Sequence, residues 1–587
     1  MTHARAFAPS FTGRRWILSE PDESAVREFV RVVGVSQTLA RLLAARGTAL
    51  EDVSDLLEPT LKRLLPEPFR LKDMEKAVAR AKAALDAGEA IAVFGDYDVD
   101  GSSSTALLCE FFSTLGHRPR IYIPDRMTEG YGPSASAFRK LQDEGTKLVI
   151  TVDCGAAATA ALDAARAAGL DVVVLDHHTV EHAPPALAHV NPNQPDDTSG
   201  LGYLCAAGVT FLFVVALNRA LRESGWYAAR GIAEPDLRTA LDLVGLATIC
   251  DVVPLLGVNR AFVRAGITRI AAGVRPGLAA LAQIAGANAP YTPHHLGFVF
   301  GPRINAGGRV GKCSLGAELL AAASAAEAGP MALMLDIHNR ERQAIEAMIL
   351  DEAMDLASRQ GDAPFILVAG EGWHSGVVGI VAGRLKERFG KPALVAGLEG
   401  GVGRGSARSV LGVDIGAAVR AARQAGVLEA GGGHAMAAGF SLLGDQLGSF
   451  RAFLEQWFAE RPASTAAPEL ALDIAVSASG ATQALVEDMA RIGPFGPGNP
   501  EPVCAALDVT VAHADVVGEK HVRVKLAGAD GARLDAIAFR SVDTDLGKGL
   551  LKARGARIHV AGVLRTDQWN GRTRVQLLIE DAAAAGV

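Results

Sequence analysis

The sequence predicts a multidomain α/β protein. We expect a Rossmann-like domain with a parallel sheet, a long connecting helix, a second α/β domain and a small C-terminal β-barrel. Three patterns predict this: short apolar runs alternate with helical patterns over 89–176, an amphipathic stretch fills 311–360, and five alternating runs follow Pro502. A chain of 587 residues also exceeds what one hydrophobic core usually supports.

The first domain is predicted from a βαβ pattern. Its apolar runs and helical patterns alternate at 91–94, 105–114, 121–123, 148–152, 156–168 and 172–175. The last run is apolar at consecutive positions, which is typical of a strand that is covered on both faces. Crossover helices make such sheets parallel and doubly wound.

The later domains follow from three further patterns. Leucine and isoleucine alternate with charges after Pro330, which predicts the connecting helix. A strand at 365–369 and a helix at 377–389 predict the second α/β domain. The barrel strands are expected at 507–511, 521–526, 536–539, 557–563 and 573–579. We therefore predict a packing segment at 1–75 and domains at 76–310 and 361–460 around the helix at 311–360, then a linker and proline-rich segment at 461–504 and the barrel at 505–587.

Composition argues against a membrane-spanning or secreted protein. No apolar run approaches the roughly 20 residues that cross a bilayer, and the N-terminus lacks the apolar core of a secretory signal, so we expect a cytoplasmic protein. The six cysteines form no CxxC pair, which argues against a disulfide framework and a structural zinc site.

The net charge is −7, but 505–587 hold 12 Lys or Arg and 10 Asp or Glu. That local balance of +2 favours nucleic-acid contact by the barrel.

Three alternate carboxylates follow the strand at 91–94, in the sequence GDYDVDG. Their repulsion makes this arrangement costly without a cation. Ligands collect at the carboxyl ends of strands in open α/β sheets. Asp153 ends a second strand, Asp176-His177-His178 ends a third, and Asp251 follows an apolar helix. The sequence therefore predicts ligand-type side chains from three strands at one edge of the sheet.

Each part of this cluster also has a plainer interpretation. A DxDxD pattern is often a calcium loop, and the following DGSSS can simply cap a helix. Asp153 or the two histidines, taken alone, are more often turn or surface residues. Their joint placement favours a metal site, and oxygen ligands with one imidazole suit Mn²⁺ or Mg²⁺. Four or five carboxylates exceed what one ion needs, so we expect two ions and phosphoester hydrolysis.

Four motifs carry a resemblance to a known family. GDYDVDG, TVDCG, the DHH at 176–178 and ATICDVVPL resemble the motifs of the DHH phosphoesterase superfamily, and most of the chain resembles the RecJ single-strand exonucleases of bacteria. The resemblance implies metal ligands at Asp96, Asp98, Asp100, Asp153, His177 and Asp251, with Asp153 between the ions. It implies catalytic roles for Asp98, Asp100, Asp153, His177, His178 and Asp251. His178 would contact the scissile phosphate or hold the hydrogen bonds of the site, and Asp176 would orient the loop.

The second domain carries motifs that resemble the RecJ form of the DHH-associated domain, namely GPRINAGGR, GWHSGVVGI, GSARS and GGHAMAAG. Glycines let backbone N–H groups approach a phosphate, and arginines grip it with forked donors. Glycine-rich stretches also mark ordinary turns, and a lone histidine more often packs or caps. The predicted phosphate and DNA contacts are Arg303, Asn305, Arg309, His374, Ser406, Arg408 and His434.

The resemblance also implies the role of the barrel and of the chain ends. The barrel would be an OB-fold that tracks a single strand, although aromatic residues for base stacking are sparse and Phe539 is one of few candidates. The first 75 residues show no recognisable chemistry. We expect that the additional C-terminal domain of some RecJ-like proteins is missing.

By resemblance, the activity is two-metal hydrolysis of single-stranded DNA from 5′ to 3′, releasing 5′-mononucleotides in DNA repair and recombination. Single-stranded DNA, a single-stranded-DNA-binding protein and a RecQ-type helicase are the implied partners, and we expect a monomer. Two alternatives remain open. A DHH hydrolase of short oligonucleotides or cyclic dinucleotides would lack the barrel, and a non-catalytic DNA-binding scaffold would lack the metal ligands.

Overall fold

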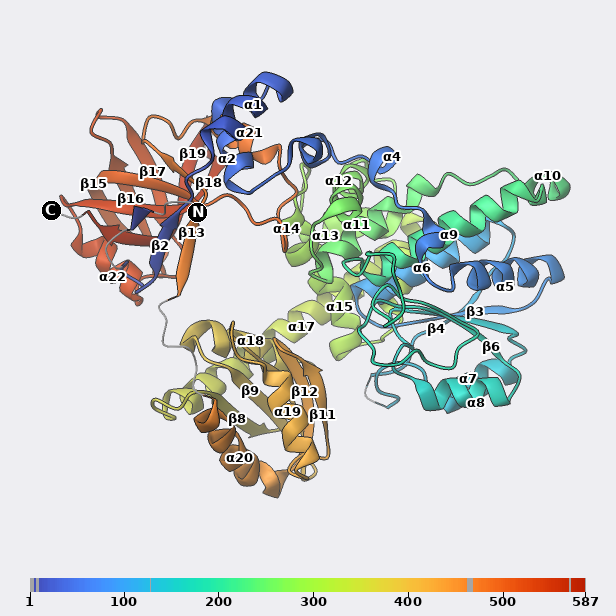
Figure 1. Cartoon of the computed structure of the whole chain (residues 1–587). Helices are drawn as coiled ribbons and strands as arrows, with labels where there is room; N and C mark the ends of the chain where they lie inside the picture. The colour runs from blue at the N-terminus through green and yellow to red at the C-terminus, as the bar shows by residue number, and fades with distance from the viewer. Residues whose placement is uncertain (1–4, 7–9, 127, 462–467, 570–571, 586–587) are drawn as a thin grey trace. The chain divides into compact units, whose positions relative to one another are not determined.

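The structure is a computed structural model that describes all residues except 1–4, 7–9, 127, 462–467, 570–571 and 586–587. The chain divides into two compact units. The first unit comprises residues 67–251 and 265–465, and the second comprises residues 1–66, 252–264 and 466–587. Figure 1 shows both units, with labels where there is room for them.

The first unit begins with a five-stranded parallel sheet. Its strands lie in the order β4 (Arg120–Tyr122), β3 (Ile91–Gly95), β5 (Leu148–Val152), β6 (Asp171–Leu175) and β7 (Ala188–Val190). Every residue of β3 and β5 is buried. Strands that are apolar at consecutive positions need cover on both faces, so this burial follows from the sequence.

Helices supply that cover. Helices α7 (Ala135–Asp143) and α8 (Thr159–Ala167) lie on one face of the parallel sheet, whereas α5 (Met74–Ala87), α6 (Val99–Thr114) and α9 (Ala206–Glu223) lie on the other (Figure 1). On the first face, Phe138 and Leu162 pack against Phe94 and Val149. The doubly wound, Rossmann-like domain predicted from the sequence is confirmed.

A single helix, α17 (Ala325–Ser358), connects this domain to the next. The second sheet has the order β11 (Ala430–His434), β12 (Ala437–Leu443), β10 (Val402–Arg408), β9 (Ala393–Glu399) and β8 (Ile366–Glu371), and only β8 and β9 are parallel to each other. Residues of α17 and α18 (Val378–Phe389) pack on one face, and residues of α19 (Ile415–Gln424) and α20 (Leu447–Glu460) pack on the other. The predicted connecting helix and second α/β domain are therefore present, but the helix begins at Ala325 and not at residue 311, because a separate short helix, α16 (Leu315–Leu320), precedes it.

The second unit is built around a closed β-barrel. Its strands are β15 (Cys504–Val517), β16 (His521–Ala527), β17 (Arg533–Ala538), β18 (Arg557–Trp569) and β19 (Arg572–Ala584). The order β15-β16-β17-β19-β18 is closed by pairing of β15 with β18. Closure removes the exposed edges of the sheet. All five predicted barrel strands are confirmed.

The N-terminal residues belong to the core of this second unit. Phe29 of α1 (Glu23–Val33) and Leu42 of α2 (Gln37–Ala45) pack in one cluster with barrel residues such as Val560. Strand β2 (Arg15–Leu18) pairs in parallel with β13 (Glu469–Leu472). The range that we predicted as linker carries regular elements too, namely β13, β14 (Ile474–Val476) and α21 (Gln483–Ala490).

No helix in the part of the chain that the structure describes is both long and apolar enough to cross a membrane.

Asp581 ties the N-terminal segment to the barrel. Its fully buried carboxylate accepts hydrogen bonds from Thr12 Oγ1 at 2.8 Å and from Trp16 Nε1 at 3.0 Å, and Arg14 Nε lies 3.2 Å away. Because Asp581→Ala removes the acceptor of the buried Trp16 N–H and of the Thr12 hydroxyl, and the partner of one cation, we expect it to lower the free energy of unfolding by about 2–4 kcal/mol.

Denaturation of the full chain in urea, followed by circular dichroism, measures this loss. Arg15→Ala is the control, because the Arg15 side chain is 65% exposed and its ion pair with Glu469 should contribute less than about 1 kcal/mol. Equal losses in the two variants would contradict the anchoring role of Asp581.

Candidate metal centre

Three carboxylates follow β3, and the start of α6 fixes their positions. Asp98 caps α6 by accepting a hydrogen bond from Gly101 N at 3.0 Å. Both oxygens of Asp100 accept backbone N–H groups at the start of α9, from Ala206 at 2.7 Å and Ala207 at 2.8 Å. The helix N-terminus stabilises the negative charge of Asp100 and prevents its side chain from rotating.

Asp153 follows β5 and has an unusual backbone conformation. Its φ of 60° lies in the left-handed region that side chains other than glycine rarely adopt. Tyr131 Oη donates a hydrogen bond to the backbone carbonyl oxygen of Asp153 at 3.0 Å. This conformation directs a carboxylate that is only 3% exposed toward the histidine that follows β6.

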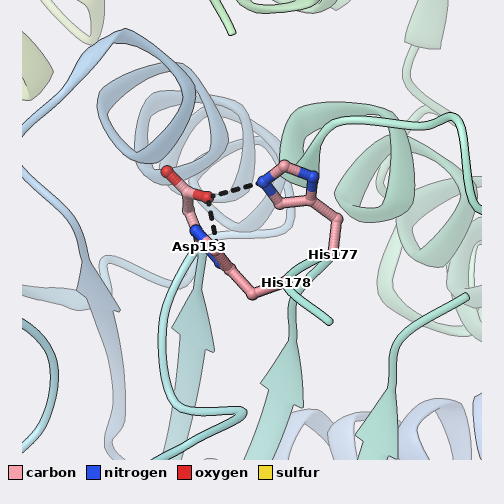
Figure 2. A group of neighbouring side chains, drawn as sticks. All are labelled: Asp153, His177 and His178. Carbon is pink, nitrogen blue, oxygen red and sulfur yellow. Dashed lines mark ion pairs between the residues drawn. The ribbon is translucent and has the colours of Figure 1, made fainter. Parts of the chain in front are cut away.

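Asp176, His177 and His178 follow β6 and have different roles. Asp176 accepts hydrogen bonds from the backbone N–H groups of Ala156, His177 and His178, and its Oδ1 also lies 2.7 Å from His178 Nδ1. It therefore holds the loop rather than facing the site. Figure 2 shows that the rings of His177 and His178 both approach Asp153, at 3.4 Å from Oδ1 to His177 Nε2 and 4.0 Å to His178 Nδ1.

Asp251 completes the cluster from a different element. It ends α11 (Leu241–Cys250), and its Oδ2 lies 3.6 Å from His177 Nε2. Three sets of three side chains place potential ligand atoms within 4.8 Å of one another. They are Asp96/Asp98/Asp153, Asp100/His177/Asp251 and Asp153/His177/His178. The structure thus brings together all six side chains that the resemblance assigned to metal ions, together with His178.

Negative charge dominates this cluster. Burial and the charges of neighbouring carboxylates raise the pKa of Asp96 and Asp153 well above the ordinary value, the pKa of Asp100 to about 7 and the pKa of Asp251 to about 9. Such shifts mean that the protein alone does not compensate the carboxylate charges. Divalent cations would compensate them.

The two histidines differ in charge. Burial and the nearby charge of His178 lower the pKa of His177 to about 4, which leaves it as the neutral imidazole that metals prefer. Burial opposes protonation of His178, but the hydrogen bond and the charge of Asp176 raise its pKa to about 9. Burial would raise the pKa of Asp176, but the hydrogen bond and the charge of His178 lower it to about 2. His178 and Asp176 therefore form an ion pair at neutral pH.

The donor atoms fit a divalent cation such as Mn²⁺ or Mg²⁺. Two buried carboxylate oxygens, Asp96 Oδ1 and Asp251 Oδ2, have no hydrogen-bond partner among the described residues. Buried oxygens without a donor are costly unless a ligand satisfies them. The described cysteines are all free thiols, and none belongs to the three groups above. Carboxylate oxygens with an imidazole suit hard cations.

Four of the predicted phosphate contacts gather at the start of α18. Arg408 Nη1 donates to Ser406 Oγ at 2.9 Å, and a side chain at Gly379 would come within 3.1–3.4 Å of both residues. Arg309 Nη1 donates to the carbonyl oxygen of Gly376 at 2.7 Å, and Gly376 N donates to His374 Nδ1 at 3.1 Å. The glycines of the GWHSGVVGI motif thus admit arginine side chains to a helix N-terminus.

The other three predicted contacts are placed differently. Arg303 Nε forms a 2.9 Å ion pair with the buried carboxylate of Asp336, which also pairs with Arg340 at 2.6 Å, and Arg303 Nη1 donates to a carbonyl oxygen, so these donors of Arg303 are already engaged. Asn305 Oδ1 is buried without a partner among the described residues. His434 is exposed on β11, two strands away from Arg408 in the same row of the sheet.

Sequence reasoning missed Arg126, which lies near both groups of residues. Its guanidinium carbon is 5.4 Å from the centre of the Tyr97 ring, and Tyr97 lies between two of the metal-site carboxylates in the sequence. Burial and the charges of Arg126, Arg342 and Arg408 lower the pKa of Arg309 to about 10. Burial and the charge of Arg126 also lower the pKa of His374. No motif surrounds Arg126, so only the structure could identify it.

An exposed aromatic pair was missed as well. Phe298 is 72% exposed and stacks on His294, with ring centres 4.9 Å apart. It belongs to the π-helix η4 (Leu296–Phe300), which contacts the end of α11 through a hydrogen bond from Cys250 Sγ to the Leu296 carbonyl oxygen at 3.4 Å. The pair therefore lies on the segment that packs beside Asp251.

Comparisons with known proteins agree with this architecture. Family models described as "DHH family, N-terminal domain", "DHHA1 domain" and "RecJ OB domain" match residues 90–247, 362–460 and 472–581. The single-stranded-DNA-specific exonuclease RecJ of Bacillus subtilis is 33% identical over 97% of this chain and 71% of its own length. The chain belongs to the RecJ family.

Other RecJ proteins match over nearly the whole chain. The RecJ exonuclease of Escherichia coli is 36% identical over 92% of this chain and 95% of its own length. The crystal structure of Thermus thermophilus RecJ in complex with Mn²⁺ superposes with a TM-score of 0.81 at 30% identity, covering 97% of this chain and 80% of that one. The predicted RecJ family and DHH superfamily are confirmed.

The ion pair between Asp176 and His178 predicts a pH effect in the metal-free protein. Because the pKa of His178 is raised, the stability from its pairing is complete below about pH 6.5 and is lost as the pH rises through about 9. Because the pKa of Asp176 is lowered, its contribution is lost only as the pH falls from about 3.8 toward 2. We expect Asp176→Asn to return the titration of His178 toward 6.5, as measured by NMR of the imidazole protons.

The control variant is Asp163→Asn, at an exposed carboxylate of the same domain, which should leave the titration of His178 unchanged. If His178 titrated at the same pH in the wild type and in Asp176→Asn, the ion pair would not be the cause of the shift.

Proposed function

We propose that this chain is a metal-dependent exonuclease specific for single-stranded DNA, which degrades the strand from its 5′ end and releases 5′-mononucleotides. The observation that carries the proposal is the convergence of five carboxylates and one neutral histidine at the carboxyl edge of the parallel sheet. Membership of the RecJ family and the OB barrel support the choice of substrate.

The proposal assigns two Mn²⁺ or Mg²⁺ ions to the site. Asp96, Asp98 and Asp153 would hold one ion, and Asp100, His177 and Asp251 would hold the other. Asp153 is the side chain suited to reach both, because its Oδ1 lies 3.4 Å from the His177 nitrogen of the second group. Bound ions supply Lewis acidity for phosphodiester hydrolysis.

The chain's own residues bind and orient the strand. His178 is cationic at neutral pH, 48% exposed and held by Asp176, so its free nitrogen can donate to an oxygen of the scissile phosphate. Ser406, Arg408, Arg309 and Arg126 offer donors for a terminal phosphate, and glycines beside them leave room for it. Arg303 already donates to Asp336, whereas Arg408 donates only to neutral oxygens among the described residues, so Arg408 is the better candidate for this contact. The Phe298 ring can stack a base near Asp251.

The remaining elements of the proposal rest on family membership. They are action in DNA repair and recombination, a single-stranded-DNA-binding protein and a RecQ-type helicase as partners, and a cytoplasmic monomer. Asn305, His374 and His434 stay proposed as DNA contacts beside the arginines.

The central test is digestion of single strands labelled at either end, with Mn²⁺ present. We expect the wild type to release labelled mononucleotides first from the 5′ end and Asp153→Ala to lose at least 1,000-fold in kcat, because both proposed ion sites lose a ligand. Asp163→Ala, an exposed carboxylate of the same domain, is the matched control and should retain full activity.

Binding of a labelled oligonucleotide by Asp153→Ala, measured by fluorescence anisotropy, separates catalysis from folding and should stay within about threefold of the wild type. Release from the 3′ end, or unchanged turnover in Asp153→Ala, would overturn the proposed polarity or the metal assignment respectively.

A second variant tests the terminal-phosphate contact. Arg408→Ala should raise the KM for 5′-phosphorylated strands by 10-fold or more, because one charge-assisted contact is lost, and it should change the KM for 5′-hydroxyl strands less than threefold. Arg404→Ala, an exposed arginine on the same strand, is the control. Equal effects on both substrates would remove Arg408 from the phosphate contact.

A further inference from the structure

A pocket of about 750 Å³ lies in the first unit, at the end of α6 opposite to the metal centre. Its size falls within the roughly 300–1,000 Å³ of pockets that hold small molecules. Cys109, Glu110, Ser113 and Thr114 of α6 line it, together with Arg118, Pro119, Ile121, Thr239, Asp242, Arg269, 274–276, 321–323 and Glu327. None of these residues belongs to the groups that could hold a metal ion.

The charged groups in this pocket divide into paired and unpaired ones. Three arginines and three carboxylates line it, so its formal charge is balanced. The buried Arg275 contacts both Asp242 and Glu110 at 2.8 Å, and Glu327 accepts a hydrogen bond from Ala323 N at 3.0 Å. The carboxylates are therefore already engaged by the protein.

Arg118 and Arg269 are the exceptions. Neither forms an ion pair or a side-chain hydrogen bond with any described residue, and Arg269 Nε is buried without a partner. A buried guanidinium N–H without an acceptor is costly, which points to an acceptor that comes from outside the chain. The start of α13 (Pro276–Ala285) lines the same pocket, and no side chain caps it. Its free N–H groups also favour an anion.

The rest of the lining is apolar or neutral. Pro119, Ile121, Val274, Pro276, Ala321 and Ala322 form apolar walls, and Ser113, Thr114 and Thr239 add hydroxyl groups. An inorganic anion would use only the two arginines and would leave these walls in contact with water. A ligand that joins a phosphate to a flat apolar ring and a hydroxylated sugar uses all of them.

We propose that this pocket binds a nucleoside phosphate and that its occupancy changes metal binding at the metal centre. The phosphate would lie between Arg118 and Arg269, and the base would lie against the apolar walls. The binding site does not depend on the proposed nuclease activity, whereas the effect on metal binding rests on the metal centre of the proposed function.

Two helices connect the pocket to the metal centre. Helix α6 carries Asp100 in its first turn and Ser113 near its end, a separation of about 20 Å at 1.5 Å per residue. Helix α11 runs from Asp242 in the pocket to Asp251 in the metal centre, about 14 Å by the same rule. Arg275 joins Glu110 of the first helix to Asp242 of the second. A ligand in the pocket would therefore lie against the residue that links the two helices carrying metal-site carboxylates.

The test is calorimetric titration of the full-length, metal-free protein with deoxyadenosine monophosphate in the presence of EDTA. We expect one binding site, at least 10-fold weaker binding of inorganic phosphate and of deoxyadenosine, and at least 10-fold weaker binding of the nucleotide by the variant with Arg118→Ala and Arg269→Ala. Because neither arginine forms an ion pair or a side-chain hydrogen bond with a residue that the structure describes, this variant should keep the wild-type melting temperature. Arg120→Ala, an exposed arginine outside the pocket lining, should bind like the wild type.

Arg408→Ala distinguishes the pocket from the phosphate contacts of the second domain. Nucleotide binding that is lost in Arg408→Ala but kept in the double variant would overturn the pocket, and so would the absence of any nucleotide binding. Equal binding of inorganic phosphate and the nucleotide would reduce the site to a simple anion site and overturn the ligand class.

A Mn²⁺ titration followed by electron paramagnetic resonance tests the second part of the proposal. Saturating nucleotide should change the Mn²⁺ affinity of the wild type by about threefold or more and leave that of the double variant unchanged. The double variant also serves as the control for chelation of Mn²⁺ by the nucleotide. Equal changes of Mn²⁺ affinity in the wild type and the double variant would overturn the coupling between the pocket and the metal centre. That result would not affect the proposed binding site or the proposed nuclease activity, which are tested separately.

Discussion

Repulsion among the carboxylates at the edge of the parallel sheet is the constraint on which the first domain depends. Five aspartates and two histidines form three overlapping groups of three, and within each group the ligand atoms lie within 4.8 Å of one another. Three of the aspartates are almost completely buried. A flexible chain would separate such charges. Strands that are covered on both faces cannot move apart, so the packing of the sheet holds the carboxylates at distances that only cations make favourable.

The protein itself orients two of the buried aspartates of the site, and it does so in different ways. Asp100 accepts two N–H groups from the start of α9, whereas Asp176 accepts three N–H groups and pairs with His178. The contacts of Asp100 orient a proposed metal ligand, and the contacts of Asp176 orient His178. The orientation of His178 thus depends on a residue that faces away from the proposed ions, which is the usual arrangement around metal sites.

Much of the fold and the site could be predicted because the relevant signals are local. A carboxylate that directly follows a buried strand must lie at the sheet edge, and this holds for Asp96, Asp153 and Asp176 alike. The ion pair of Arg303 could not be predicted, because its partner Asp336 lies 33 residues away on α17. Arg126 and Phe298 lack a motif, and their relevance comes from neighbours that only folding brings near. The short elements within 461–504 were missed because β13 and β14 depend on pairing with distant strands.

The first unit separates its uncompensated charges, and this separation explains how an acidic protein can act on a polyanion. The chain has a net charge of −7, and its most concentrated negative charge lies at the metal centre. Arg309 and Arg408 are partly buried and donate to neutral oxygens rather than to carboxylates, so their positive charge remains available. If the two cations of the proposed function are bound, they offset most of the negative charge of the carboxylate cluster. A phosphodiester strand then meets cations at the scissile bond and guanidinium groups at its terminal phosphate, and the total charge of the chain no longer predicts its affinity for DNA.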